Sequence, residues 1–270
     1  MRRVGWIALA LSVAATVAQA ELTLRPEPSS PFDLKISAGL KGQSSDAPRY
    51  VTWEDINTLP TEVLELEGEF VAGLQAVKVV FLDELWSALP VTEGADMMLA
   101  YCADNYFSIY RDEFITKWRP FLVLAIDGNG PDKWPPPGLS FNPGPYVISV
   151  ADEVVAGADS LLDVGHKKPW GVNEIRFETE SEVLAPAFAM KRQQLSASGE
   201  HGRELWINSC SSCHIGPGDW SEVTKANDRL SSLKRMPATM KTTFVVTCGS
   251  RRRSYPVPKW KLTRITPMPS

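Results

Sequence analysis

Between residues 49 and 180, apolar side chains come in short runs separated by Gly, Pro, Asn and Asp, which favour turns. A buried helix needs ~10–12 residues, so runs this short predict strands. The strands expected are residues 63–66, 77–81, 97–101, 121–126, 146–150 and 175–177, with short helices at residues 83–89 and 111–118. Short strands mixed with short helices predict an α+β domain rather than regular βαβ repeats.

The first 20 residues have the features of an export signal. Arg2 and Arg3 give a positive start, an apolar stretch covers residues 4–17, and the sequence AQA ends at Ala20 with small residues at the cleavage positions. A membrane-spanning helix needs ~20 apolar residues, so this stretch is too short to be an anchor. We therefore expect a signal peptide cleaved near Ala20, a periplasmic mature chain, and no membrane span within it.

The formal net charge of −4 argues against a nucleic-acid partner, which would usually require a basic surface. The four cysteines are Cys102, Cys210, Cys213 and Cys248, too few for a disulfide-stapled scaffold. Two interpretations of Cys102 stay open: a bridge to Cys248 in an oxidising compartment, or a free buried thiol.

The segment INSCSSCHIGPGDW, residues 207–220, contains a C-x-x-C-H motif formed by Cys210, Cys213 and His214. This spacing is the signature of covalent haem attachment. Two thiols must reach two vinyl groups on one side of a porphyrin, and the next imidazole must reach the iron. A redox-active C-x-x-C pair is the alternative function, but the export signal and the adjacent histidine favour haem. A zinc site would need a second Cys/His pair, and neither His166 nor His201 has such a partner.

The approach to the motif predicts a helix, which Ser198 would cap, with Glu200 close behind. Gly202, Trp206 and the motif resemble the first helix and haem-attaching turn of class I cytochromes c over residues 196–225. The resemblance implies an all-α cytochrome c domain, with one covalent haem c on Cys210 and Cys213. It also implies His214 as the proximal iron ligand and a C-terminal helix that Gly202 and Trp206 would meet.

The tail, residues 226–270, does not continue this resemblance. It has no helical apolar stripe and contains helix-breaking prolines. It offers Met236, Met240 and Met268 but no assignable distal ligand. Read from the third base of each codon, residues 257–269 permit a methionine loop followed by the start of a final helix. We therefore hypothesise a frameshift near residues 225–228, which would leave the cytochrome domain incomplete and which the nucleotide sequence of the gene would test.

The larger N-terminal part resembles the molybdopterin-binding domain of sulfite-oxidase-type enzymes. The segments that carry the resemblance are VVFLDELWSAL, YCADNYFSIY, FLVLAIDGNG and KKPWGVNEIRFE. The family binds molybdenum through a cysteine upstream of the first segment, and no cysteine occurs before Cys102. We therefore expect no molybdopterin and a cofactor-free docking module. Five residues are candidates to line a remnant pocket, although each is also typical of a turn or core: Tyr101, Asp104, Asn105, Tyr106 and Trp134.

The predicted order is a signal peptide (1–20), an extended lead-in (21–48), a sulfite-oxidase-like α+β domain (49–180) and a linker (181–195). The haem-bearing half of a cytochrome c domain (196–225) and the irregular tail (226–270) follow. We expect a periplasmic one-electron carrier with redox-protein partners rather than a catalyst. The alternatives are the haem-bearing subunit of a molybdopterin-dependent oxidoreductase and a haem-based sensor or ligand binder.

Overall fold

A computed structural model describes residues 21–44, 47–70, 72–104, 106–150, 164–188 and 196–214; for residues 185–188, 213 and 214 it describes the backbone alone. The predicted signal peptide and the predicted tail, with Cys248 and the three tail methionines, lie outside these residues.

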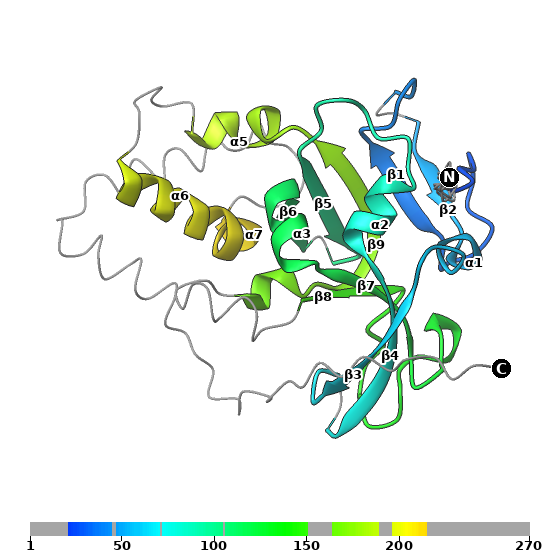
Figure 1. The fold of residues 1–270 in the computed structure, drawn as a ribbon. Helices are drawn as coiled ribbons and strands as arrows, with labels where there is room; N and C mark the ends of the chain where they lie inside the picture. Colours follow the sequence, from blue (N-terminus) through cyan, green and yellow to red (C-terminus); the bar gives the residue numbers. More distant parts are fainter. Residues whose placement is uncertain are drawn as a thin grey trace, which may run out of the picture.

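A 9-stranded sheet organises the chain (Figure 1). Its main path runs β2-β1-β9-β8-β7-β4-β3, and β5 and β6 form a branch in which β5 pairs with β9. The strands are β1 Leu34–Ala38, β2 Arg49–Val51, β3 Glu62–Glu67, β4 Leu74–Phe81, β5 Met97–Cys102, β6 Phe107–Arg111, β7 Phe121–Ile126, β8 Tyr146–Ser149 and β9 Trp170–Glu178.

Strand β9 joins the β5–β6 branch to the main path of the sheet. With nine residues it is long enough to pair with three other strands. It pairs antiparallel with β8 at its start and with β5 over most of its length, and it pairs in parallel with β1. Among the strand pairs of the described residues, β1–β9 is parallel and the others are antiparallel. A strand late in the described chain, β9, thereby holds the first strand, β1, in the sheet.

Short helices cover the sheet: α1 Trp53–Ile56, α2 Leu82–Ser87 and α3 Asp112–Trp118, with the 3₁₀ turns η1 Pro131–Lys133 and η2 Val164–Lys167. Apolar residues of α1, α2 and α3 form the largest core cluster with β1, β5, β7 and β9. On the other side of the β5–β6 branch lie α5 Glu180–Phe188, α6 Ala197–Ser209 and α7 Ser211–His214 (Figure 1).

The strands expected at residues 97–101 and 121–126 are confirmed as β5 and β7, and the other four expected strands lie on β3, β4, β8 and β9. The two expected short helices are confirmed as α2 and α3. Strands β1, β2 and β6 were not expected; β1 lies in the stretch that the sequence suggested was an extended lead-in.

The fold class expected from the sequence, an α+β domain followed by an incomplete all-α cytochrome c domain, is wrong. The described residues form a mixed, sheet-rich fold around the 9-stranded sheet, and α6 and α7 pack on that sheet. Ile207 of α6 is buried in an apolar cluster with β5, β6 and α5. Helical spacing and capping predicted the helix, but they carry no information about the surface on which it packs.

None of the helices in the described part of the chain is both long enough and apolar enough to cross a membrane.

Candidate functional site

Helix α6 leads into the cysteine motif. Its N-cap is Ser196, whose hydroxyl accepts a hydrogen bond from the backbone N–H of Gly199 at 3.2 Å. Ser198, the expected cap, lies inside the first turn, so that prediction is wrong by two residues. A capping hydroxyl bonds the N–H two or three residues further along, and Ser196 meets this condition at the observed start of the helix.

At Cys210 helix α6 ends and the short helix α7 begins. The Cys210 N–H donates to the Trp206 carbonyl at 2.9 Å, while its φ of −119° departs from regular helix. The Ser211 hydroxyl donates to the Ile207 carbonyl at 2.7 Å and ties the new turn to the old helix. The backbone from residue 210 to residue 214 is therefore one compact helical turn.

Helical spacing places positions 210, 213 and 214 on one face of this turn, because they are three and four residues apart. The intervening Ser211 and Ser212 are buried and lie toward the opposite face. Helix α7 packs against β6. The turn thus brings the two cysteine positions and the histidine position of the motif to one side, and Cys210 is partly exposed.

The apolar face of α6 is docked on the β5–β6 branch. Ile207 is 1% exposed, and Trp206 packs against the same cluster. The other members are Met97, Leu99, Tyr101, Phe107, Ile109, Val183 and Leu184. A Cβ built on Gly202 would meet nothing within 4 Å in the described part of the chain. Trp206 therefore packs against this cluster, whereas no described residue packs closely on the position of Gly202.

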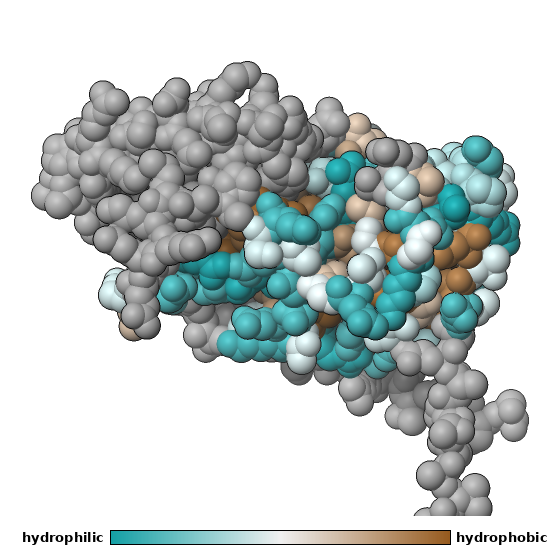
Figure 2. Space-filling model, turned by 90° about the horizontal axis from the view of Figure 1, so that it is seen from above, coloured by the Kyte–Doolittle hydropathy of each residue, from teal (hydrophilic) through white to brown (hydrophobic). Residues whose placement is uncertain are grey.

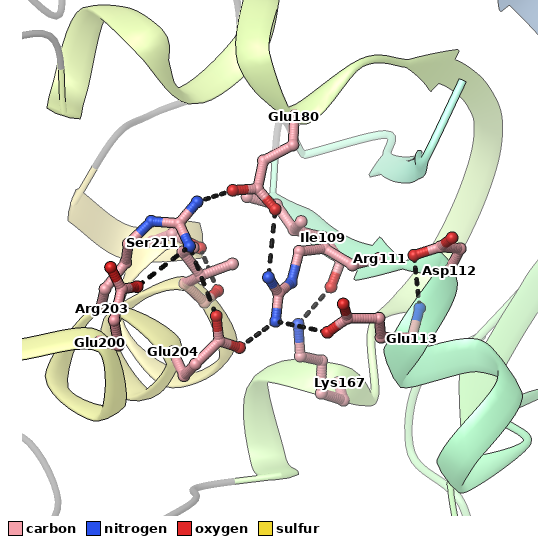
Figure 3. Close-up of polar contacts among 11 residues, drawn as sticks. Ile109, Arg111, Asp112, Glu113, Lys167, Glu180, Glu200, Arg203, Glu204 and Ser211 are labelled. Atoms are coloured by element: carbon pink, nitrogen blue, oxygen red, sulfur yellow. Dashed lines mark hydrogen bonds and ion pairs between the residues drawn. The ribbon is translucent and has the colours of Figure 1, made fainter. Parts of the chain in front are cut away.

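Beside this apolar contact lies the α6 ion-pair cluster, formed by Arg111, Glu180, Arg203 and Glu204 (Figure 3). Arg111 at the end of β6 pairs with Glu180 at 3.1 Å and with Glu204 of α6. Arg203 pairs with Glu180 and, at 3.5 Å, with Glu204. The side chains of Arg111 and Glu180 are 9% and 19% exposed, so solvent screens the pair between them less than it screens a surface pair. The cluster joins three segments that are distant in the sequence.

Replacing Arg111 with methionine is expected to lower the free energy of unfolding by about 2–3 kcal/mol. Removing one partner from a fully buried pair costs ~3–5 kcal/mol, and here Arg203 still faces both carboxylates. Denaturant titration measures the change, and amide hydrogen exchange shows whether α6 loses protection before the sheet does. The control is Arg25→Met, which removes the more exposed pair with Asp55 and should cost under ~1 kcal/mol. Equal effects of the two substitutions would contradict a special role for the cluster.

Lys167, the last residue of η2, lies beside the cluster with its side chain fully buried (Figure 3). Its Nζ donates to the Ile109 carbonyl, and it lies 4.9 Å from the centroid of the Phe114 ring. Burial and, after it, the Arg111 guanidinium lower the pKa of Lys167 to about 7, while Glu204 acts in the opposite direction. The structure therefore buries an amine that titrates near neutral pH.

Three hydroxyl groups of β6 and its approach hold η2 in place. Ser108 Oγ donates to the His166 carbonyl at 2.6 Å, and Tyr110 Oη donates to the Lys167 carbonyl at 2.9 Å. Tyr106 Oη lies 3.1 Å from His166 Nδ1. His166, for which the sequence offered no metal-site partner, is thus paired with a tyrosine.

The residues considered for a remnant pocket are not all brought together, because Trp134 lies in a different cluster from Tyr101. Tyr101 stacks on Phe107, with ring centroids 5.6 Å apart, in the cluster under α6. Trp134 belongs to a separate cluster and donates its indole N–H to the Asn129 carbonyl at 2.8 Å. Asp104 accepts a hydrogen bond from the Tyr106 N–H, and Asn105 lies outside the described residues.

Cys102 does not fit a molybdenum thiolate. Its thiol is free and buried, and burial, with Asp104 as a second cause, raises its pKa to about 12. A metal ligand must be the thiolate, which this site disfavours. Strand β3, which lies upstream of the segment VVFLDELWSAL, contains no cysteine. Within the described ranges, no three His, Cys, Asp or Glu side chains are grouped so as to hold a metal ion.

The sequence did not reveal Arg111, Glu204 or Lys167 as related residues. A signal for two of them exists: an arginine ends the apolar run FSIYR, and Glu200, Arg203 and Glu204 place charges on one side of α6. Nothing local marks Lys167, since it follows a histidine and precedes another lysine.

No family model matches the chain, and no curated protein matches it.

Proposed function

We propose that the chain is a c-type cytochrome that carries one haem and transfers single electrons in the periplasm. The observation that supports this most is the compact turn from residue 210 to residue 214, whose backbone puts positions 210, 213 and 214 on one face. A covalent haem c needs this arrangement of two thiols and an imidazole. The donor set of the turn therefore fits the group.

In this proposal Cys210 and Cys213 form the two thioethers and His214 supplies the proximal ligand. When bound, the haem supplies an iron that cycles between the ferric and ferrous states. The chain's own residues position the turn: Ser211 bonds back to Ile207, and the α6 ion-pair cluster fixes the helix on β6 and α5. The distal ligand is not assigned.

The sheet is proposed to dock a redox-protein partner without a cofactor of its own. Because α6 packs directly on the β5–β6 branch, a partner held by the sheet would keep a fixed relation to the haem. On the face seen in Figure 2, hydrophilic residues predominate and apolar residues form smaller patches between them. Such a surface suits a transient partner, since transient interfaces are more polar than obligate ones.

The test is to produce the full chain in a host that attaches haem c in its periplasm. We expect one haem per chain, retained after denaturation, with the pyridine haemochrome spectrum of two thioether bonds. Cys210→Ala should leave a single-thioether spectrum, and the double variant Cys210→Ala/Cys213→Ala should lose covalent haem. Cys102→Ala, which removes a buried core thiol, is the matched control and should keep the wild-type spectrum.

Wild-type protein that folds in that host without covalent haem would overturn the proposal. Stoichiometric molybdenum in the purified protein would instead favour the oxidoreductase subunit. Carbon monoxide binding to the reduced protein would favour a sensor or ligand binder, because a six-coordinate carrier resists it.

A further inference from the structure

The side chain of Lys167 is fully buried, which is rare for a lysine. Its Nζ faces the Ile109 carbonyl and the rings of Tyr110 and Phe114, 5.4 and 4.9 Å from their centroids. Lysines are almost never fully buried unless they are paired. The carbonyl and the two rings favour a positive charge here, while burial disfavours it.

Charged groups of both signs surround this amine. Arg111 and Glu204 act on it directly. Glu113 of α3 and Glu180 of α5 pair with Arg111, and Arg203 of α6 pairs with Glu204 and Glu200 (Figure 3). His166 and Tyr106 lie at the neighbouring end of η2. Of these groups, Arg111 disfavours the ammonium form and Glu204 favours it, so charges of opposite sign act on the protonation of this amine.

Both protonation states of Lys167 are accessible near neutral pH. Burial lowers its pKa to about 7, with Arg111 as the second cause, and Glu204 acts in the opposite direction. Of these groups, Glu204 connects the amine to the cysteine motif. It lies on α6 six residues before Cys210, which is ~9 Å along a helix axis.

The same helix packs against the turn that carries Lys167, so the geometry between the amine and the motif is fixed. An electron added to a group on residues 210–214 therefore acts electrostatically on Lys167 from a position that the packing fixes. At an effective dielectric constant of ~20 and a separation on the order of 15 Å, it changes the proton affinity about sixfold.

We propose that Lys167 takes up a proton when the haem is reduced, so that electron transfer by this chain is coupled to protonation of a buried amine. This rests on the proposed function. In the balanced step, a one-electron donor protein reduces ferric to ferrous haem, and the neutral amine takes a proton from solvent to become the ammonium. Oxidation reverses both, with the electron leaving to the acceptor and the proton to solvent.

The test is potentiometric titration of the haem in the full chain between pH 5.5 and 9, with small redox mediators as electron donors. We expect the midpoint potential to fall as pH rises through a window that begins near pH 7. A sixfold difference in proton affinity corresponds to a total fall of about 45 mV. Lys167→Met should remove this fall, and Glu204→Gln should move it to lower pH because a carboxylate that favours the ammonium is lost.

Lys117→Met, which removes an exposed lysine on α3, is the matched control and should leave the wild-type profile unchanged. A wild-type potential independent of pH over this range, or a fall that persists in Lys167→Met, would overturn the coupling while leaving haem attachment intact. Absence of covalent haem is a separate outcome, visible in the spectrum before any titration, and it would refute the proposed function instead.

Discussion

Replacing Gly39 with alanine is expected to destabilise the protein by more than ~4 kcal/mol, an exceptional effect for one methyl group. Gly39 follows β1 with φ of +77°, and an added Cβ would overlap the backbone carbonyl oxygen of Phe177 on β9. Backbone cannot move aside as a side-chain end can, so β1 would have to separate from β9. The Gly39 carbonyl also accepts the Thr92 N–H at 2.8 Å, which anchors the other side of this turn.

The measurement is the free energy of unfolding from denaturant titration. Gly42→Ala is the matched control, because Gly42 has φ of +70° but an added Cβ there would meet nothing within 4 Å. Gly42→Ala should therefore lower the free energy of unfolding only by the strain of a positive φ, about 1 kcal/mol. Similar losses at the two positions would show that strain, and not the close approach of β1 to β9, explains both.

Replacing Lys167 with methionine is expected to raise the free energy of unfolding by roughly 3–4 kcal/mol at pH 7, which is unusual for the loss of a hydrogen-bonded group. Burial holds the folded-state pKa of Lys167 at about 7, below the ordinary value of 10.5. Between these values the native chain binds fewer protons than the unfolded chain, so stability rises with pH across the window. Below about pH 7 both states are protonated and the full penalty remains.

The stability gain from Lys167→Met should therefore shrink as pH rises from 7 toward 10. At the upper end the variant should be about 1 kcal/mol less stable than the wild type, because it lacks the hydrogen bond to the Ile109 carbonyl. Denaturant titrations of both proteins at several pH values measure this difference, which cancels the other titrating groups. Lys117→Met should show no such trend. A gain that does not change with pH would mean that Lys167 stays charged in the folded protein.

Much of the sheet was predictable because its strands are short apolar runs bounded by turn residues. Residues 121–126 match β7 in full, and residues 97–101 fall one residue short of β5. Strand β1 was missed because LKISA has only a brief alternation and follows a proline-rich stretch. Its partner is β9, some 140 residues later, and the pairing of distant strands leaves no local trace.

The local geometry of the candidate site was also predictable from the sequence, but its packing was not. The spacing of Cys210, Cys213 and His214 is local, so the sequence alone puts these positions on one face of a helical turn. The helix start was placed two residues late because two serines, Ser196 and Ser198, compete for the cap and only the backbone hydrogen bonds decide between them. The residues that hold the helix, such as Arg111 and Glu180, come from segments that no local pattern connects.

The sequence by itself determined which short segments form strands and which positions of the cysteine motif share a helical face, because both depend on spacing between near neighbours. Only the tertiary structure decided where that helix lies, against the β5–β6 branch and not in a separate helical domain. It also decided that Lys167 is buried beside Arg111 and Glu204. Burial and ion pairing depend on which distant segments meet, and that is fixed by packing of the whole sheet.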